Sequence, residues 1–201
     1  MYKKQTSILI LLFFICSITN SQNEHKEYYE SGELKSIVKA KENEEHIFES
    51  ISYYKNGNIS ETGEIKKHFG ASVVFRKHGY WKYYHENGVI KMEGTFFLDR
   101  PTRFWKQYYE NGKLENIWEY DSHGDRAGPW EKYYKNGKLQ QIGGFIFGKP
   151  SGEWKFYHEN GKLHLIGEYS YRGGETGEWK EYKENGKLYS SGEMIEGKQS
   201  G

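Results

Sequence analysis

A five-residue unit, Tyr-x-x-x-Gly, recurs seven times along this chain. Neighbouring units are 24 or 25 residues apart, except for one gap of 31 residues. The seven glycines are Gly32, Gly57, Gly88, Gly112, Gly137, Gly161 and Gly186. Self-similarity at such a period is typical of an array in which each small unit buries its apolar face against its neighbours. The repeat therefore predicts one elongated array, and it favours a binding or structural role over catalysis.

Each unit carries further residues at fixed distances from its glycine. Asparagine precedes the glycine in six units, Leu or Ile follows it by two residues in all seven, and another glycine usually follows it by six. An aliphatic or aromatic residue, or alanine in the first unit, follows by eight. Tryptophan stands seven residues before the glycine in five consecutive units, namely Trp81, Trp105, Trp130, Trp154 and Trp179, which belong with Gly88, Gly112, Gly137, Gly161 and Gly186.

This pattern predicts β-hairpins. Asn-Gly between runs of aromatic and β-branched residues is the strongest local hairpin signal, because both residues tolerate positive φ. Residues 154–158 and 162–169 are thus predicted strands around the turn at Asn160-Gly161. Looser Gly-rich segments such as 148–152 link one hairpin to the next, and no segment has a capped 3.6-residue period. We expect an all-β antiparallel meander of about seven tandem hairpins.

Composition supports a thin sheet. Hydrophobic residues make up 35% of the chain and aromatic residues 17%, and there are 24 glycines. Aromatics at this level argue against disorder, and the small aliphatic share argues against a thick core. A glycine in mid-strand predicts the close approach of a large neighbour such as an indole ring.

The spacing of Trp and Tyr leaves one question open. The two residues are three apart in every unit that has both, as in Trp154 and Tyr157. On a regular strand they point to opposite faces, unless a bulge intervenes. Either both faces carry aromatic residues or each unit contains a bulge.

Two irregularities interrupt the array. Residues 65–79 fall in the longest unit and predict an inserted loop or a lengthened hairpin, a place where arrays often carry function. Residues 197–201 copy the inter-hairpin turn shortly before a further tryptophan is due. They indicate either a terminal half-unit or a chain cut from a longer one.

The first 21 residues are of another kind. Lys3 and Lys4 precede an apolar run at 8–15 and a small-residue stretch ending at Ser21, which is typical of a cleaved signal peptide. An uncleaved anchor and a lipoprotein built on Cys16 are the alternatives. We expect a bacterial chain that is periplasmic, cell-surface or secreted, with residues 22–201 forming the array and no integral membrane segment after cleavage.

Export also sets the charge and the thiol content. The mature chain would lose Cys16, the single cysteine, so that neither a disulfide nor a thiolate metal site is possible. Its 29 − 2 = 27 basic residues against 28 acidic ones give a net charge of −1. Without a basic excess, sequence-independent nucleic-acid binding is not expected.

Catalysis and metal binding are not expected either. His85 and His158 stand three residues before the glycine, at a position where other units have Tyr or Lys, which fits a variable surface position better than a metal site. The segment from Asp121 to Asp125 has the composition of a turn and too few ligands for calcium. Nothing resembles a nucleophile elbow, a phosphate loop or a zincin helix, so we expect neither an enzyme nor a cofactor.

The aromatic residues are the main candidates for binding. Most of them are expected to form the core, while Tyr54, Tyr109 and Tyr134 are predicted to form an exposed platform, with His85 and His158 at the same position of other units. Tyrosine is enriched at interfaces that bury much energy in few residues. The expected partner is another protein, and a cell-envelope glycan stacked on the rings is the alternative.

The units at 152–163 and 177–188, with Gly-Glu-Trp-Lys followed by Tyr-x-Glu-Asn-Gly-Lys-Leu, resemble MORN repeats. They are most similar to the bacterial variant found in antitoxin-like MORN-repeat proteins, and the resemblance covers about residues 27–201. It implies an elongated hairpin array that acts in protein–protein contact, sometimes with membrane association, and has no active site. Members described as antitoxins would neutralise a toxin by binding it, a role that fits an exported chain only if the toxin is exported too.

Overall fold

The protein is described from a computed structural model covering residues 24–70, 72–195 and 198–199. These residues form strands and turns, with no helix among them. The expected signal segment, 1–21, lies outside the described residues. The strands are β1 (Glu24–Tyr28), β2 (Leu34–Ala40), β3 (Ile47–Tyr53), β4 (Ile59–Phe69), β5 (Val73–Tyr84), β6 (Ile90–Phe97), β7 (Arg100–Tyr108), β8 (Leu114–Tyr120), β9 (Arg126–Tyr133), β10 (Leu139–Ile146), β11 (Lys149–Tyr157), β12 (Leu163–Tyr169), β13 (Glu175–Tyr182), β14 (Leu188–Ile195) and β15 (Lys198–Gln199).

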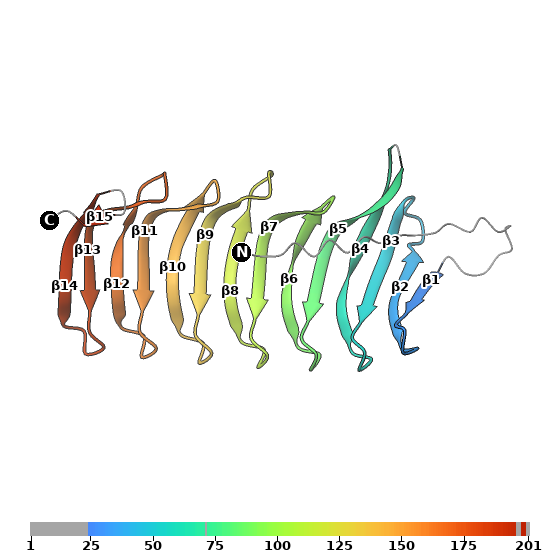
Figure 1. Cartoon of the computed structure of the whole chain (residues 1–201), viewed down its shortest axis with the longest axis horizontal. Coiled ribbons are helices and arrows are strands. Elements are labelled where there is room, and N and C mark those ends of the chain that lie inside the picture. Colours follow the sequence, from blue (N-terminus) through green and yellow to red (C-terminus); the bar gives the residue numbers. More distant parts are fainter. Residues whose placement is uncertain (1–23, 71, 196–197, 200–201) are drawn as a thin grey trace, which may run out of the picture.

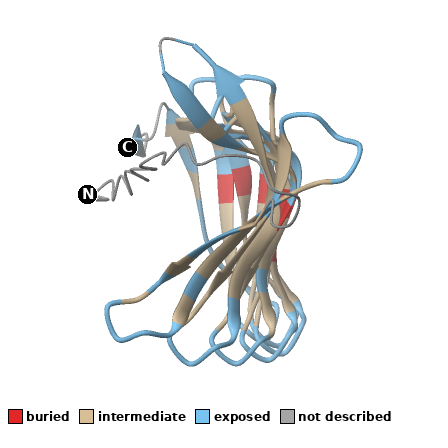
Figure 2. Cartoon of the chain, turned by 90° about the vertical axis from the view of Figure 1, so that its right-hand side faces the viewer, coloured by how far each residue is buried: buried red, intermediate tan, exposed pale blue. Residues whose placement is uncertain are grey.

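All strands belong to one antiparallel sheet in which each strand pairs with its neighbours in the sequence (Figure 1). Seven hairpins follow one another, from β1–β2 to β13–β14. The turns within the hairpins, Ser-Gly in the first and Asn-Gly in the other six, line one long edge of the sheet, which we call the Asn-Gly edge, and the turns between hairpins line the other (Figure 1). Seen along its length, the sheet is curved like a trough (Figure 2). The predicted all-β meander of tandem hairpins is confirmed.

The turns form for the reason that the sequence suggests. In the β11–β12 turn, Gly161 has a φ of 92°, which glycine adopts without steric penalty. The side-chain oxygen of Asn160 accepts a hydrogen bond from the backbone N–H of Lys162 at 2.9 Å. The same side-chain bond recurs in the turns that begin with Asn56, Asn87, Asn111, Asn136 and Asn185. Each turn is therefore fixed by its own asparagine and glycine.

Bulges and two aromatic faces both occur. The register shifts beside the tyrosine in every hairpin, for example between Phe156 and Tyr157, and the same shift is seen in the other six. Trp130 and Glu131 are neighbours in β9 and point to opposite faces. The hydroxyl of Tyr133 donates to Glu131, which places this tyrosine on the face opposite the tryptophan. We call these the tryptophan face and the tyrosine face.

The extra residues of the longest unit lengthen β4 and β5, the two strands that link the second hairpin to the third. They therefore form a lengthened strand pair, which is the predicted lengthened hairpin, and not an inserted loop. Strands β4 and β5 remain paired up to Phe69 and Val73, and this hairpin projects beyond the others at the inter-hairpin edge (Figure 1). The extension adds a projecting arm to the N-terminal third of the sheet.

Candidate functional site

The core of this single-layer sheet is a row of tryptophans stacked on glycines. A Cβ atom built on Gly94 would lie 2.2 Å from the ring of Trp105, a distance that no real contact allows. Only glycine leaves room for the ring, as the mid-strand glycines predicted. Each tryptophan covers the glycine of the preceding hairpin in four places: Gly63–Trp81, Gly94–Trp105, Gly143–Trp154 and Gly167–Trp179. These four tryptophans are between 1% and 8% exposed.

The array departs from this rule in the middle. Trp118 replaces the mid-strand glycine of its hairpin and is itself buried. Its ring lies 6.1 Å from that of Trp130, centroid to centroid. Trp130, which has no glycine beneath it, is only half-buried. A large residue at the glycine position thus displaces the next tryptophan outward.

The N-terminal hairpins depart in another way from the stacking of tryptophan on glycine. The tryptophan positions hold His25 and Ser50, and the first glycine position holds Val38, which pairs directly with Ser50. The small serine makes room for the valine, so volume is partly conserved. The remaining space is a pocket of about 220 Å³ on the tryptophan face. Its lining includes Val38, Ser50, Ser52, Glu61, Lys77 and Trp81.

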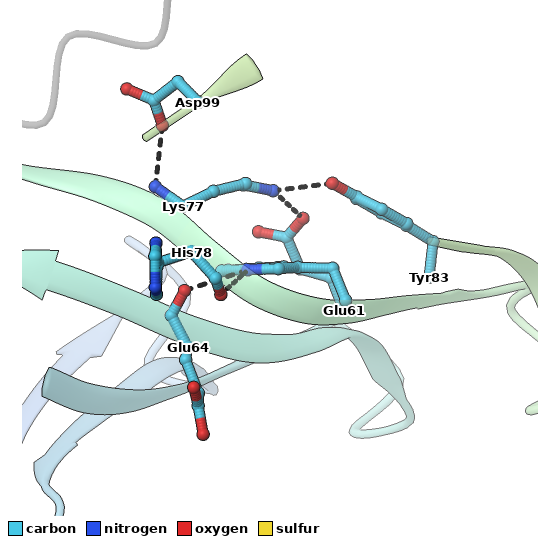
Figure 3. A network of polar contacts seen from close by, with 7 residues as sticks. Glu61, Glu64, Lys77, His78, Tyr83 and Asp99 are labelled. Atoms are coloured by element: carbon cyan, nitrogen blue, oxygen red, sulfur yellow. Dashed lines mark hydrogen bonds and ion pairs between the residues drawn. The ribbon is translucent and has the colours of Figure 1, made fainter. Parts of the chain in front are cut away.

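At this pocket, the ammonium group of Lys77 on strand β5 contacts several neighbouring side chains (Figure 3). The Nζ atom of Lys77 donates to Glu61 at 2.8 Å and to the hydroxyl of Tyr83 at 2.9 Å. It also lies 3.9 Å from the ring centroid of Trp81, within the range of a cation–π contact. The backbone N–H of Lys77 donates to Asp99 in the next inter-hairpin turn at 2.7 Å. Burial, and then the charge of Glu61, raise the pKa of the Tyr83 hydroxyl above its usual range.

Sequence reasoning missed this cluster, although a signal exists. Lys77 stands eleven residues before its glycine, and Arg126 stands at the same position two units later. Arg126 also covers an aromatic ring, since its guanidinium carbon lies 4.8 Å from the centroid of Trp130. The units between and after them have Pro or Glu at that position. A basic residue eleven positions before the glycine therefore predicts a cation–π contact with the tryptophan of the same unit.

The five residues predicted as a binding surface have a structural task. Tyr54, Tyr109 and Tyr134 donate their hydroxyls to the backbone carbonyl of the tyrosine in the next hairpin, at 2.6 to 2.7 Å. His85 and His158 place Nε2 at 2.9 and 2.8 Å from the equivalent carbonyls. Each residue therefore joins one hairpin to the next, and we call this contact the clasp.

The clasp corrects the expectation of an exposed platform. All five side chains are half-buried, and their polar atoms bond along the array instead of pointing into solvent. The position varies because Tyr and His can both reach the same carbonyl. Whether the outer parts of these rings also contact a partner stays a prediction.

The tyrosine face carries hydrogen-bonded Tyr–Glu pairs. The hydroxyl of Tyr108 donates to Glu93 at 2.7 Å. Desolvation by burial and the bond to Glu93 raise the pKa of Tyr80, on the neighbouring strand, to about 12. Glu93 thus stabilises two protonated tyrosines at neutral pH, a role that calls for no catalytic function.

The segment from Asp121 to Asp125 is a turn, as predicted. Asp121 accepts hydrogen bonds from the backbone N–H groups of His123 and Asp125 at 2.8 and 2.9 Å. These backbone bonds lower the pKa of Asp121. Over the described residues, no group of three or more His, Cys, Asp or Glu side chains has the arrangement of a metal site. No helix in the described part of the chain is long and apolar enough to cross a membrane.

One family accounts for this architecture. The sequence model described as "MORN repeat variant" matches six stretches of the chain: residues 22–41, 77–97, 105–122, 126–146, 150–171 and 175–195. The unmatched segment, 42–76, contains the hairpin with Ser50 in place of tryptophan and most of the lengthened arm. No curated protein matches the chain. With more than half of its residues in these matches and a hairpin at each of them, the chain belongs to the MORN repeat variant family.

Proposed function

We propose that this chain is an exported, non-catalytic repeat protein that binds another protein and acts as an interaction or scaffold module. MORN repeats suggest a binding or scaffold role, and the stacked tryptophans and the clasp give the array the rigidity that such a role needs. Export rests on the sequence of residues 1–21.

The observation that carries the proposal is the break in the repeat at the N-terminal end. There the lengthened β4–β5 arm projects from the sheet (Figure 1). The missing tryptophans leave a pocket that Glu61 and Lys77 help to line. Phe69, near the tip of the arm, is 56% exposed. An exposed aromatic side chain on a projection, with a pocket close by, is a feature of protein-binding surfaces.

A glycan partner has less support. It depended on the rings of Tyr54, Tyr109 and Tyr134 forming a free platform, and their hydroxyls bond to the next hairpin. We therefore place the binding surface at the arm and not along the clasp.

The test compares substitutions of two phenylalanines whose side chains are almost equally exposed. Full-length chain, its Phe69→Ser variant and its Phe104→Ser variant are used to capture proteins from envelope extract, since Phe69 and Phe104 are 56% and 55% exposed. We expect one saturable protein partner, identified by mass spectrometry, that Phe69→Ser loses and Phe104→Ser keeps. Equal capture by both variants, or retention on glycan beads alone, would contradict the proposal.

Export is tested separately. We expect the mature chain to begin at Gln22 and to be found outside the cytoplasm, and Leu11→Arg to leave it unprocessed inside. N-terminal sequencing of fractionated cells measures both, and an unprocessed wild-type chain in the cytoplasm would refute export.

A further inference from the structure

The two long edges of the sheet differ in chemistry. Among the residues that the structure describes, fourteen large apolar side chains are exposed. Eight of them lie on or next to the turns that link hairpins: Phe69, Val73, Val74, Phe97, Ile146, Phe147, Tyr171 and Ile195. Four others, Tyr28, Ile59, Leu188 and Tyr189, lie next to the turns within hairpins on the opposite edge. The apolar exposure is thus concentrated on the inter-hairpin edge.

Backbone strain is found on the same edge. Phe147 has a φ of 50° and is 79% exposed, although a bulky residue rarely adopts positive φ. Leu98, in the β6–β7 turn, has a φ of 49°. Asparagine or glycine would relieve this strain, as in every turn of the opposite edge. Strained residues of this kind cluster at functional sites, so a bulky apolar residue at the β10–β11 tip points to a contact made there.

Two acidic residues on one side of the midpoint of this edge have basic counterparts at the same distances on the other side. The β8–β9 turn carries Asp125, and the next turn, β10–β11, is followed by Lys149, both exposed. One turn further out on each side, the β6–β7 turn carries Asp99 and the β12–β13 turn carries Arg172. An axis midway between the β8–β9 and β10–β11 turns therefore places Asp125 opposite Lys149 and Asp99 opposite Arg172, although Arg126 and Arg100 directly follow the two acids.

The apolar residues match about the same axis. Phe97, at the end of β6, is then opposite Tyr171 of the β12–β13 turn. Phe69 and Val73 of the projecting arm are opposite Ile195 at the end of β14. A surface whose members pair with each other under a two-fold rotation is the requirement for an isologous dimer.

We propose that two copies of this chain associate through the inter-hairpin edge in antiparallel fashion, with Phe147 at the centre. Asp125 of each copy then pairs with Lys149 of the other, and Phe97 with Tyr171. This inference shares the arm, with Phe69, with the surface proposed above for the protein partner, but its centre at Phe147, Asp125 and Lys149 lies elsewhere on the edge. The variants that test it below therefore leave Phe69 unchanged.

The available area is sufficient. Eight side chains that expose about 100 Å² each would provide at most about 800 Å² per copy on full burial, which is the size of a standard protein interface. Turns on this edge are about 9.6 Å apart, twice the spacing of strands, so each pairing has a fixed place along the axis. The dimer is tested over about 1–100 μM chain, a range in which association by about −5.5 to −8 kcal/mol is detected.

Cysteine pairing tests the register directly. In full-length chain with Cys16→Ser, copies carrying Asp125→Cys are mixed with copies carrying Lys149→Cys and oxidised. We expect mixed disulfide dimers in clear excess over like-with-like dimers, since like positions are separated by about one turn spacing, beyond the reach of a disulfide. The control pair, Lys162→Cys with Glu184→Cys on the Asn-Gly edge, should not crosslink between copies.

Charge exchange and strain relief test the energetics. By sedimentation, we expect Lys149→Asp to weaken the dimer about tenfold and the double variant Asp125→Lys, Lys149→Asp to restore it. Phe147→Asn should weaken the dimer at least tenfold while leaving thermal stability unchanged or higher, because Asn accepts positive φ. Tyr189→Asn, which alters an exposed tyrosine (63%) away from this edge, should leave the dimer unaffected.

Three results would overturn the proposal. The first is a monomer throughout the stated concentration range. The second is a dimer that Phe147→Asn does not weaken or that forms no mixed disulfide. The third is a monomer that binds vesicles of phosphatidylglycerol and phosphatidylethanolamine through Phe147, which would assign this edge to a lipid surface.

Discussion

Gly94→Ala is the substitution that most directly tests the stacking of tryptophan on glycine. The new methyl carbon would lie 2.2 Å from Cδ2 of Trp105, whereas carbon atoms in contact are separated by about 3.5–4.0 Å. The ring would therefore have to move by about 1.5 Å. It is only 3% exposed and is enclosed by Phe96, whose ring centroid is 4.9 Å away, and by Trp118.

The expected loss of stability follows from this enclosure. Overpacking of a core costs about 1–3 kcal/mol, and a ring held on both sides belongs in the upper half of that range. Alanine also reduces the entropy of the unfolded chain, which returns about 0.4–1 kcal/mol, and Gly94 is not at positive φ. We expect Gly94→Ala to lower the free energy of unfolding by about 2 kcal/mol. Urea unfolding followed by circular dichroism measures the change, and hydrogen exchange places it in β6 and β7.

A double-mutant cycle separates the clash from other effects. With Trp105→Ala already present, Gly94→Ala should have little effect, which gives a coupling energy of about 2 kcal/mol. Gly70→Ala is the control, because its Cβ would lie 3.8 Å from the nearest atom, the carbonyl oxygen of Ser72. If Gly94→Ala changed stability by no more than this control, the tryptophan would not be held by the glycine, and our account of the core would be wrong.

Three further predictions concern the turns, the clasp and the tyrosine face. Gly161→Val should destabilise the β11–β12 hairpin by at least 1 kcal/mol, because a β-branched residue strongly disfavours a φ of 92°; an unchanged melting temperature would refute the turn. Tyr134→Phe removes the 2.6 Å bond to the carbonyl of Tyr157 and should cost about 0.5–1.5 kcal/mol, measured by urea unfolding, whereas no loss would mean that the clasp adds nothing to stability. Burial, and then the bond to Glu131, raise the pKa of Tyr133 to about 12, so the protonated form is favoured in the folded state. Its contribution is complete below pH 10 and lost as the pH rises through 12; ultraviolet titration should show a late ionisation step that is smaller by one tyrosine in Tyr133→Phe, and identical titrations would contradict the assignment.

The sequence determined the local structure because its signals act over short distances. Asn-Gly turns such as Asn160-Gly161 fix hairpins through two residues, and their regular spacing fixes a meander without knowledge of distant contacts. The mid-strand glycines also predicted a large neighbouring side chain, because glycine leaves space that only another side chain fills. The lengthened unit at 65–79 could be located, although a loop and a hairpin remained equal alternatives.

Tertiary structure decided everything that depends on contacts between units. The ring above Gly94 belongs to the next hairpin, and no residue near Gly94 in the sequence says so. Tyr109 and His85 looked like surface residues, because the carbonyl that each one binds lies 23 to 24 residues further along the chain. Lys77 is held by Glu61 of β4 and by Asp99 of the β6–β7 turn, which lie 16 and 22 residues away in the sequence. A repeat in sequence specifies the unit, but the distances between units, and hence the sites they form, arise only when the sheet curves and brings them together.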